Sequence, residues 1–155
     1  MLATGLAMAA FGATACGDDD PVAPRKPAPI LRKAVAPEYK DRKPPEGFDL
    51  ADPANIAAGK VLFEGQPKDG GGNCFSCHGM GGKGDGTQGV GLDPRPTDLT
   101  SEEFQASVKV DYIYWRVKTG NVGGPANSAM TGFVGEHPDE KFWQVVAYVR
   151  SLRGK

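Results

Sequence analysis

Apolar residues recur at helical spacing about one third of the way along the chain, and residues suited to helix ends bracket them. Asp52 is a good N-cap, Pro53 fits the first helical position, and Gly65 fits the position just past the end. This pattern predicts a helix over residues 53–64. Its buried stripe would consist of Ile56, Gly59 and Phe63.

A second amphipathic pattern ends the chain and opens near His137 and Pro138. A glycine inside a helix costs about 1 kcal/mol relative to alanine, so we interpret Gly59 as a position where another helix crosses closely. Tyr148 or Trp143 of the last helix is the expected partner. The broad apolar face of that helix consists of Phe142, Trp143, Val145, Val146, Val149 and Leu152.

Two shorter helical signals lie between these stretches. The run Thr100-Ser101-Glu102-Glu103 reads as a capping box. Residues 111–119 read as a helix that stops at Gly120, with apolar positions spaced for burial. The patterns together predict an all-α fold of three to five helices and no strands.

The first fifteen residues form an apolar run that is too short to span a bilayer but suits a secretory signal peptide (1–15). The run ends Ala-Thr-Ala before Cys16, which resembles the lipobox of bacterial lipoproteins and implies lipidation of Cys16. Ordinary cleavage after the same residues, leaving a free thiol, is the alternative. Residues 16–47 then form a proline-rich tether, and residues 48–155 form the folded domain.

Charge and cysteine content narrow the function classes. The domain, residues 48–155, carries 11 basic and 13 acidic residues, a net of −2, so a generic nucleic-acid role is not supported. The chain has three cysteines, and two of them fall in one short motif. No intramolecular disulfide framework is therefore expected.

Residues 74–78 spell Cys-Phe-Ser-Cys-His. Two thiols at this spacing can add across the two vinyl groups of a haem, and the adjacent imidazole can then ligate the iron. A thioredoxin-like redox pair would instead start a helix in a βαβ unit, and glycine-rich sequence flanks this motif. A zinc site needs four ligands, and the neighbours Cys77 and His78 would rarely both reach one ion. The motif predicts one covalent haem c held by Cys74, Cys77 and His78.

The order of these features resembles class I cytochromes c over residues 52–155. The resemblance implies a first helix crossing a last helix, a haem-centred core, and a late methionine as second axial ligand of the iron. It also implies that the other ring nitrogen of His78 donates to a backbone carbonyl; spacing points near Val90, and we leave the acceptor open. The matching residues are Gly59, Phe63, Cys74, Cys77, His78 and Tyr148, with Pro94, Pro96, Asp98 and Leu99 in a P-x-P-x-D-L stretch.

Met130 is the candidate for the second axial ligand. Two methionines would leave with the signal peptide, and Met80 lies two residues past the motif histidine, on the side that this histidine already occupies. Met130 lies in the Gly- and Ser-containing run 120–133, which reads as a loop. The family counterpart is usually followed by proline, where this chain has threonine. Packing alone is the alternative role for Met130, and His137 is the rival ligand.

These features predict a one-electron carrier rather than an enzyme. The expected partners are redox proteins or subunits of a respiratory or photosynthetic membrane complex, with no small-molecule substrate and no nucleic acid. The signal and Cys16 predict the periplasmic side of a bacterial envelope, with a lipid anchor in the inner membrane. A haem sensor or a peroxidase-like enzyme with an open sixth iron position is the alternative function.

Overall fold

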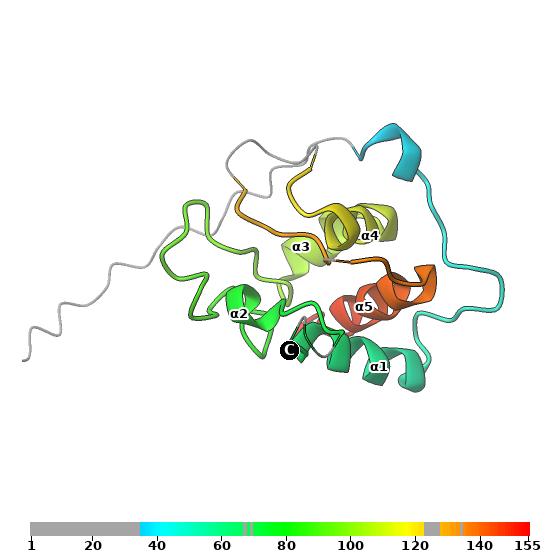
Figure 1. Cartoon of the computed structure of the whole chain (residues 1–155), viewed down its shortest axis with the longest axis horizontal. Helices are drawn as coiled ribbons and strands as arrows, with labels where there is room; N and C mark the ends of the chain where they lie inside the picture. The colour runs from blue at the N-terminus through cyan, green and yellow to red at the C-terminus, as the bar shows by residue number, and fades with distance from the viewer. Residues whose placement is uncertain (1–34, 67, 69, 123–127, 134) are drawn as a thin grey trace, which may run out of the picture.

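The computed structural model describes residues 35–66, 68, 70–122, 128–133 and 135–155. This part of the chain has five α-helices, one short 3-10 helix (η1) and no strand, which confirms the all-α prediction. In Figure 1, α5 lies between α1 on one side and α4 on the other, and α2 lies beside the end of α1. The elements are η1 (Pro37–Tyr39), α1 (Pro53–Glu64), α2 (Phe75–His78), α3 (Glu102–Ser107), α4 (Val110–Thr119) and α5 (Asp139–Ser151).

Helix α1 begins and ends where the sequence signals predict. The Asp52 carboxylate accepts from the Ala54 backbone N–H at 2.8 Å, and the Gly65 N–H donates to the Val61 carbonyl at 2.8 Å. The first bond satisfies one of the free N–H groups at the start of the helix, which makes Asp52 a working N-cap.

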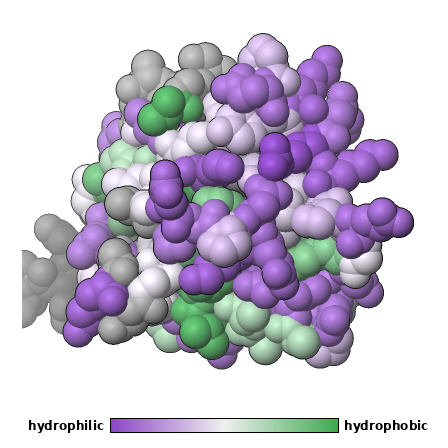
Figure 2. All heavy atoms as spheres, turned by 45° about the vertical axis from the view of Figure 1, so that its right-hand side comes forward, coloured by the Kyte–Doolittle hydropathy of each residue, from purple (hydrophilic) through white to green (hydrophobic). Residues whose placement is uncertain are grey.

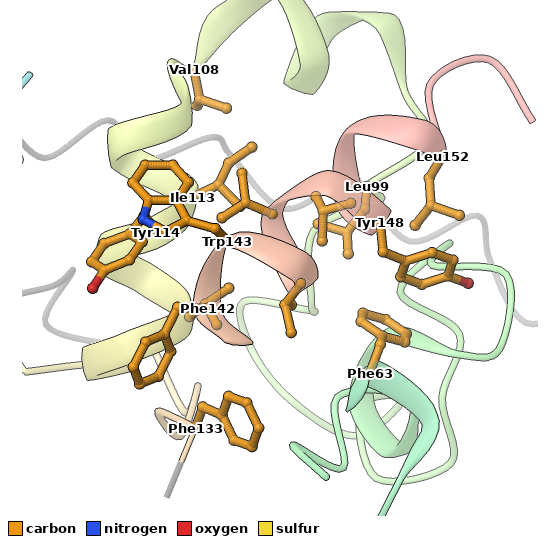
Figure 3. Close-up of a cluster of buried hydrophobic side chains, with 14 of the residues drawn as sticks. Phe63, Leu99, Val108, Ile113, Tyr114, Phe133, Phe142, Trp143, Tyr148 and Leu152 are labelled. Atoms are coloured by element: carbon orange, nitrogen blue, oxygen red, sulfur yellow. The ribbon is translucent and has the colours of Figure 1, made fainter. Parts of the chain in front are cut away.

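Helices α1 and α5 cross in close contact at Gly59. A Cβ atom added at Gly59 would lie 1.9 Å from the Gln144 carbonyl oxygen and 2.9 Å from Tyr148 Cβ. The rings of Phe63 and Tyr148 then meet edge to face, 5.2 Å apart (Figure 3). The prediction that Gly59 permits a close crossing, with Tyr148 as its neighbour, is confirmed.

The apolar face of α5 forms the centre of the core (Figure 3). Trp143 and Val146 are fully buried, and the Trp143 ring lies 4.6 Å from the ring of Tyr114 on α4. Both aromatic residues donate a hydrogen bond to the Asp139 carboxylate, Trp143 through Nε1 at 3.2 Å and Tyr114 through its hydroxyl. Apolar packing and a polar clamp therefore hold α4 on α5.

Helix α3 starts one residue later than the predicted capping box implies. Ser101 is the N-cap, and its hydroxyl accepts from the Phe104 N–H at 3.2 Å. The backbone N–H and the hydroxyl of Thr100 both donate to Asp98 Oδ1, at 2.8 and 2.7 Å, so Thr100 belongs to a turn closed by Asp98. This turn lies before the helix and leaves Ser101 as the N-cap.

Residues 37–42 contact helices α4 and α5. The Asp41 N–H donates to Asp111 Oδ2 at 2.8 Å, and Arg42 Nη2 bonds Asp139 Oδ1 at 2.9 Å. The Arg42 guanidinium also lies over the Tyr114 ring, 4.8 Å from its centre. The described end of the predicted tether is thus fixed to α4 and α5, while the division at residues 47 and 48 stays a prediction.

The predicted signal peptide, Cys16 and most of the tether lie outside the described residues. Within the described ranges, none of the helices combines the length and the apolar character needed to cross a bilayer. Hydrophilic side chains dominate the face of the molecule shown in Figure 2. Exposed large apolar side chains in the described ranges are Val61, Met80, Val90 and Val122.

Candidate haem-binding site

One turn of helix carries the three motif residues. Cys74 is the N-cap of α2 with helical dihedral angles, and the His78 N–H donates to the Cys74 carbonyl at 2.9 Å. Residues three and four apart share one face of a helix, so this turn presents Cys74, Cys77 and His78 on the same side. That is the arrangement that two thioethers and an axial imidazole on one ring require.

The glycine-rich loop after α2 wraps the carbonyl end of that helix. The Gly84 N–H donates to the His78 carbonyl at 2.8 Å, and the Gly86 N–H donates to the Cys77 carbonyl at 3.1 Å. A Cβ at Gly86 would lie 2.4 Å from the Ser76 carbonyl oxygen, so only glycine fits there. The glycines that follow the motif allow the backbone of this loop to pack directly on the backbone of α2. The loop thereby holds α2 in place.

His78 is held in the form that ligates a metal. Its Nδ1 lies 3.1 Å from the Thr97 carbonyl oxygen, which places the proton on Nδ1 and leaves the Nε2 lone pair free. Desolvation lowers the pKa of His78, and the nearby charge of Arg116 lowers it further, while the bond to Thr97 acts in the opposite direction. The carbonyl that the sequence left open is therefore that of Thr97.

Burial, against a lowering backbone hydrogen bond and with a smaller contribution from the neighbouring Cys77, raises the pKa of the Cys74 thiol to about 12. A redox-active dithiol needs a lowered thiol pKa, so this environment argues against a thioredoxin-like pair. In the described ranges, no three His, Cys, Asp or Glu side chains are grouped so that they could hold a metal ion, which leaves the zinc alternative unsupported.

Met130 lies next to the end of α4. Its sulfur is 3.6 Å from Arg116 Nη2, and its N–H donates to Ser128 Oγ at 3.3 Å. A Cβ at Gly120 would lie 2.1 Å from the Gly132 nitrogen, so the segment that carries Met130 runs closely past the helix end. Met130 is thus partly buried on a segment that packs against the end of α4. Its role as iron ligand stays a prediction.

Met80, which the sequence excludes as the second ligand, and His137, the rival ligand, have other surroundings than Met130. Met80 is 58% exposed, which suits a surface position better than a metal ligand. The His137 ring stacks on the Phe133 ring at 4.2 Å and meets the edge of the Phe142 ring at 6.2 Å. His137 therefore has a packing role beside the start of α5.

Arg116 is a site residue that the sequence reasoning missed. It is only 8% exposed, and its Nη1 has no hydrogen-bond partner in the described part of the chain. It contacts Met130 and is close enough to His78 to affect the pKa of that imidazole. The signal in the sequence is a cation between Trp115 and Val117, on a helix whose apolar stripe predicts burial. These groups fit a haem with its carboxylates. They are two thiols, a free imidazole nitrogen, a thioether and a buried cation whose Nη1 has no hydrogen-bond partner in the described residues.

Comparisons with known proteins agree with this chemistry. Residues 54–149, from α1 to α5, match the family model described as cytochrome C oxidase, cbb3-type, subunit III. No curated protein matches the chain. A similar solved chain belongs to the reducing HAO-like protein complex of Kuenenia stuttgartiensis, with 27% sequence identity and a TM-score of 0.52. That match covers 74% of this chain and 53% of the solved chain.

Proposed function

The chain belongs to the family of cbb3-type cytochrome c oxidase subunit III, binds a c-type haem covalently and takes part in haem-based electron transfer. From this premise we propose that Cys74 and Cys77 form the thioethers to the haem. We further propose that His78 and Met130 ligate the iron. The observation that carries the proposal is the fixed imidazole, with Nδ1 bonded to Thr97 and Nε2 free.

The bound haem would supply a one-electron couple between ferric and ferrous iron. The residues of the chain supply orientation and exclusion of water. Thr97 fixes the ring of His78, and the packed ring of Phe63 lies 6.4 Å from it. Met130 would occupy the remaining axial position, which leaves no open coordination site for a substrate. No general acid or base is required for this chemistry.

The carrier would serve protein partners on the outer side of a bacterial inner membrane. Support for the location comes from the sequence before residue 35, in which Cys16 would carry a lipid and the prolines would extend the chain. Support for redox partner subunits comes from the family and from the solved chain of a protein complex.

The optical spectrum of the ferric holoprotein tests the ligand set. We expect a far-red iron–sulfur band in the wild-type protein and its loss in Met130→Ala. The matched control is Met80→Ala, which removes an exposed methionine near the motif and should keep the band. A band that survives Met130→Ala contradicts the assignment. Fast binding of carbon monoxide to the wild-type ferrous protein would instead favour a sensor or peroxidase-like site.

A further inference from the structure

A short segment, residues 97–99, holds the imidazole of His78. The Thr97 carbonyl oxygen lies 3.1 Å from His78 Nδ1, and two residues further on the Leu99 N–H donates to the Gly82 carbonyl at 2.7 Å. Gly82 lies in the glycine-rich loop that follows the motif, so the segment is fastened to the same loop that packs on α2. The orientation of the imidazole therefore depends on how residues 97–99 are held.

A buried amide holds the far end of this segment. Gln105 is only 4% exposed, and its Nε2 donates both to the Leu99 carbonyl at 2.6 Å and to the Val149 carbonyl of α5 at 2.8 Å. A side-chain amide nitrogen has two N–H donors, so one group can link two carbonyls. Gln105 thus ties residues 97–99 to the last helix.

Arg150 determines which way the amide of Gln105 points. Its Nη1 donates to Gln105 Oε1 at 3.0 Å and to the Gln105 backbone carbonyl at 2.8 Å, and its Nη2 donates to the Val108 carbonyl at 2.6 Å. A guanidinium has only donors, so the amide oxygen faces Arg150 and the amide nitrogen faces the two carbonyls. A continuous chain of hydrogen bonds therefore runs from α5 through Gln105 to Leu99.

We propose that Gln105 is a positioning residue for the axial imidazole: by holding Leu99 against α5, it keeps the Thr97 carbonyl in place as the acceptor for His78 Nδ1. This inference rests on the proposed haem site. A firm hydrogen bond from Nδ1 to a carbonyl raises the basicity of the imidazole at Nε2, which favours the ferric state of the iron. Gln105 thereby lowers the reduction potential through Leu99 and Thr97.

The test compares variants of the holoprotein. Gln105→Met keeps an unbranched side chain of similar length and removes the donor, and Arg150→Lys keeps the positive charge but removes the planar guanidinium that orients the amide. Tyr114→Phe is the matched control, because it also removes one hydrogen bond to α5, at Asp139 in the first turn. The readouts are the midpoint potential, the exchange rate of the His78 Nδ1 proton in the ferrous protein by NMR, and the midpoint of unfolding in urea.

In Gln105→Met we expect the ferric-to-ferrous ratio at the wild-type midpoint to fall about threefold, which is about 28 mV at about 59 mV for each tenfold change. The His78 Nδ1 proton should exchange about fivefold faster, as the net loss of one hydrogen bond implies. Arg150→Lys should change both quantities in the same direction, by about twofold each. Tyr114→Phe should lower the unfolding midpoint and leave the potential and the exchange rate at their wild-type values.

A wild-type potential in Gln105→Met, with a wild-type rate of Nδ1 exchange, would overturn the inference and leave Gln105 with a role in packing only. Equal shifts of the potential in Gln105→Met and Tyr114→Phe would also overturn it, since the effect would then follow stability alone. If Gln105→Met does not fold, the comparison of Arg150→Lys with Tyr114→Phe decides in the same way. Failure of the proposed function is distinct, because it would show as a missing iron–sulfur band in the wild-type spectrum.

Discussion

Replacing Gly59 by alanine should force α1 away from α5. The added Cβ would lie 1.9 Å from the Gln144 carbonyl oxygen and 2.9 Å from Tyr148 Cβ. A Cβ atom essentially never lies closer than 3.0 Å to such a neighbour, so the two helices must separate by about 1.1 Å, the difference between 3.0 and 1.9 Å. The nearest atoms belong to a helix backbone, which cannot turn aside as a flexible side chain can.

Two opposing contributions, helix propensity and overpacking, determine how much Gly59→Ala changes the free energy of unfolding. Alanine favours the helix over glycine by about 1 kcal/mol, while overpacking a tight contact costs roughly 1–3 kcal/mol and more where backbone must move. The overpacking cost at Gly59 should lie at or above the upper end of this range, because backbone atoms must move. We therefore expect a net loss of about 2 kcal/mol in the free energy of unfolding. For a domain of this size, that loss lowers the midpoint of thermal unfolding by about 8 °C.

The assay is denaturant unfolding of the holoprotein, followed by circular dichroism. Ala57→Gly is the matched control, because Ala57 is exposed on the same helix and the change measures propensity without steric contact. We expect it to cost about 1 kcal/mol. If Gly59→Ala stabilises the protein by that same amount, the close crossing does not exist in solution and the reasoning is refuted.

Two further changes test the polar parts of the core. Gln105→Leu should lower the free energy of unfolding by about 2 kcal/mol. Gln105 Nε2 donates to the carbonyls of Leu99 (2.6 Å) and Val149 (2.8 Å), so the change removes this donor from Leu99 and leaves Val149 with the Leu152 N–H at 3.3 Å. Unfolding in urea measures this, and a loss below half that size contradicts it. Asp139→Asn should cost about 1 kcal/mol at pH 7. Desolvation raises the pKa of Asp139, but hydrogen bonds from Tyr114 and other donors outweigh it and hold this pKa below its usual value. A lowered carboxyl pKa contributes stability that is present above about pH 4 and is lost as the pH falls through the folded value, so the variant should show a flatter acid limb in unfolding curves below pH 4.

The sequence predicted the bounds of α1 and, to within one residue, the start of α3. Asp52 caps the residue two places on, and the boundaries of α1 are correct. The start of α3 was displaced by one residue because Thr100 belongs to a turn closed by Asp98. A partner only two positions away was thus enough to change the cap.

The candidate site was predictable only in its local part. The C-x-x-C-H spacing lies within one helical turn, so sequence alone indicates the chemistry. The partner of His78 lies 19 positions further along, at Thr97, and depends on the path of a loop that glycines permit. The burial of Arg116 depends on how α4 packs on α5. The contact of His78 with Thr97 has no signature in the single sequence, whereas the crossing at Gly59 had one in a glycine inside a helix.

The closing contact of the domain joins its first and last α-helices. Gly59 meets Gln144 across about 85 residues of chain, and the cysteine motif lies inside that interval. Long intervals lose more entropy on closure than short ones, so such a contact forms late. Until the 13 residues of α5 dock, α1 lacks its main partner. We therefore expect the haem to be attached to an open chain, before the final helix docks.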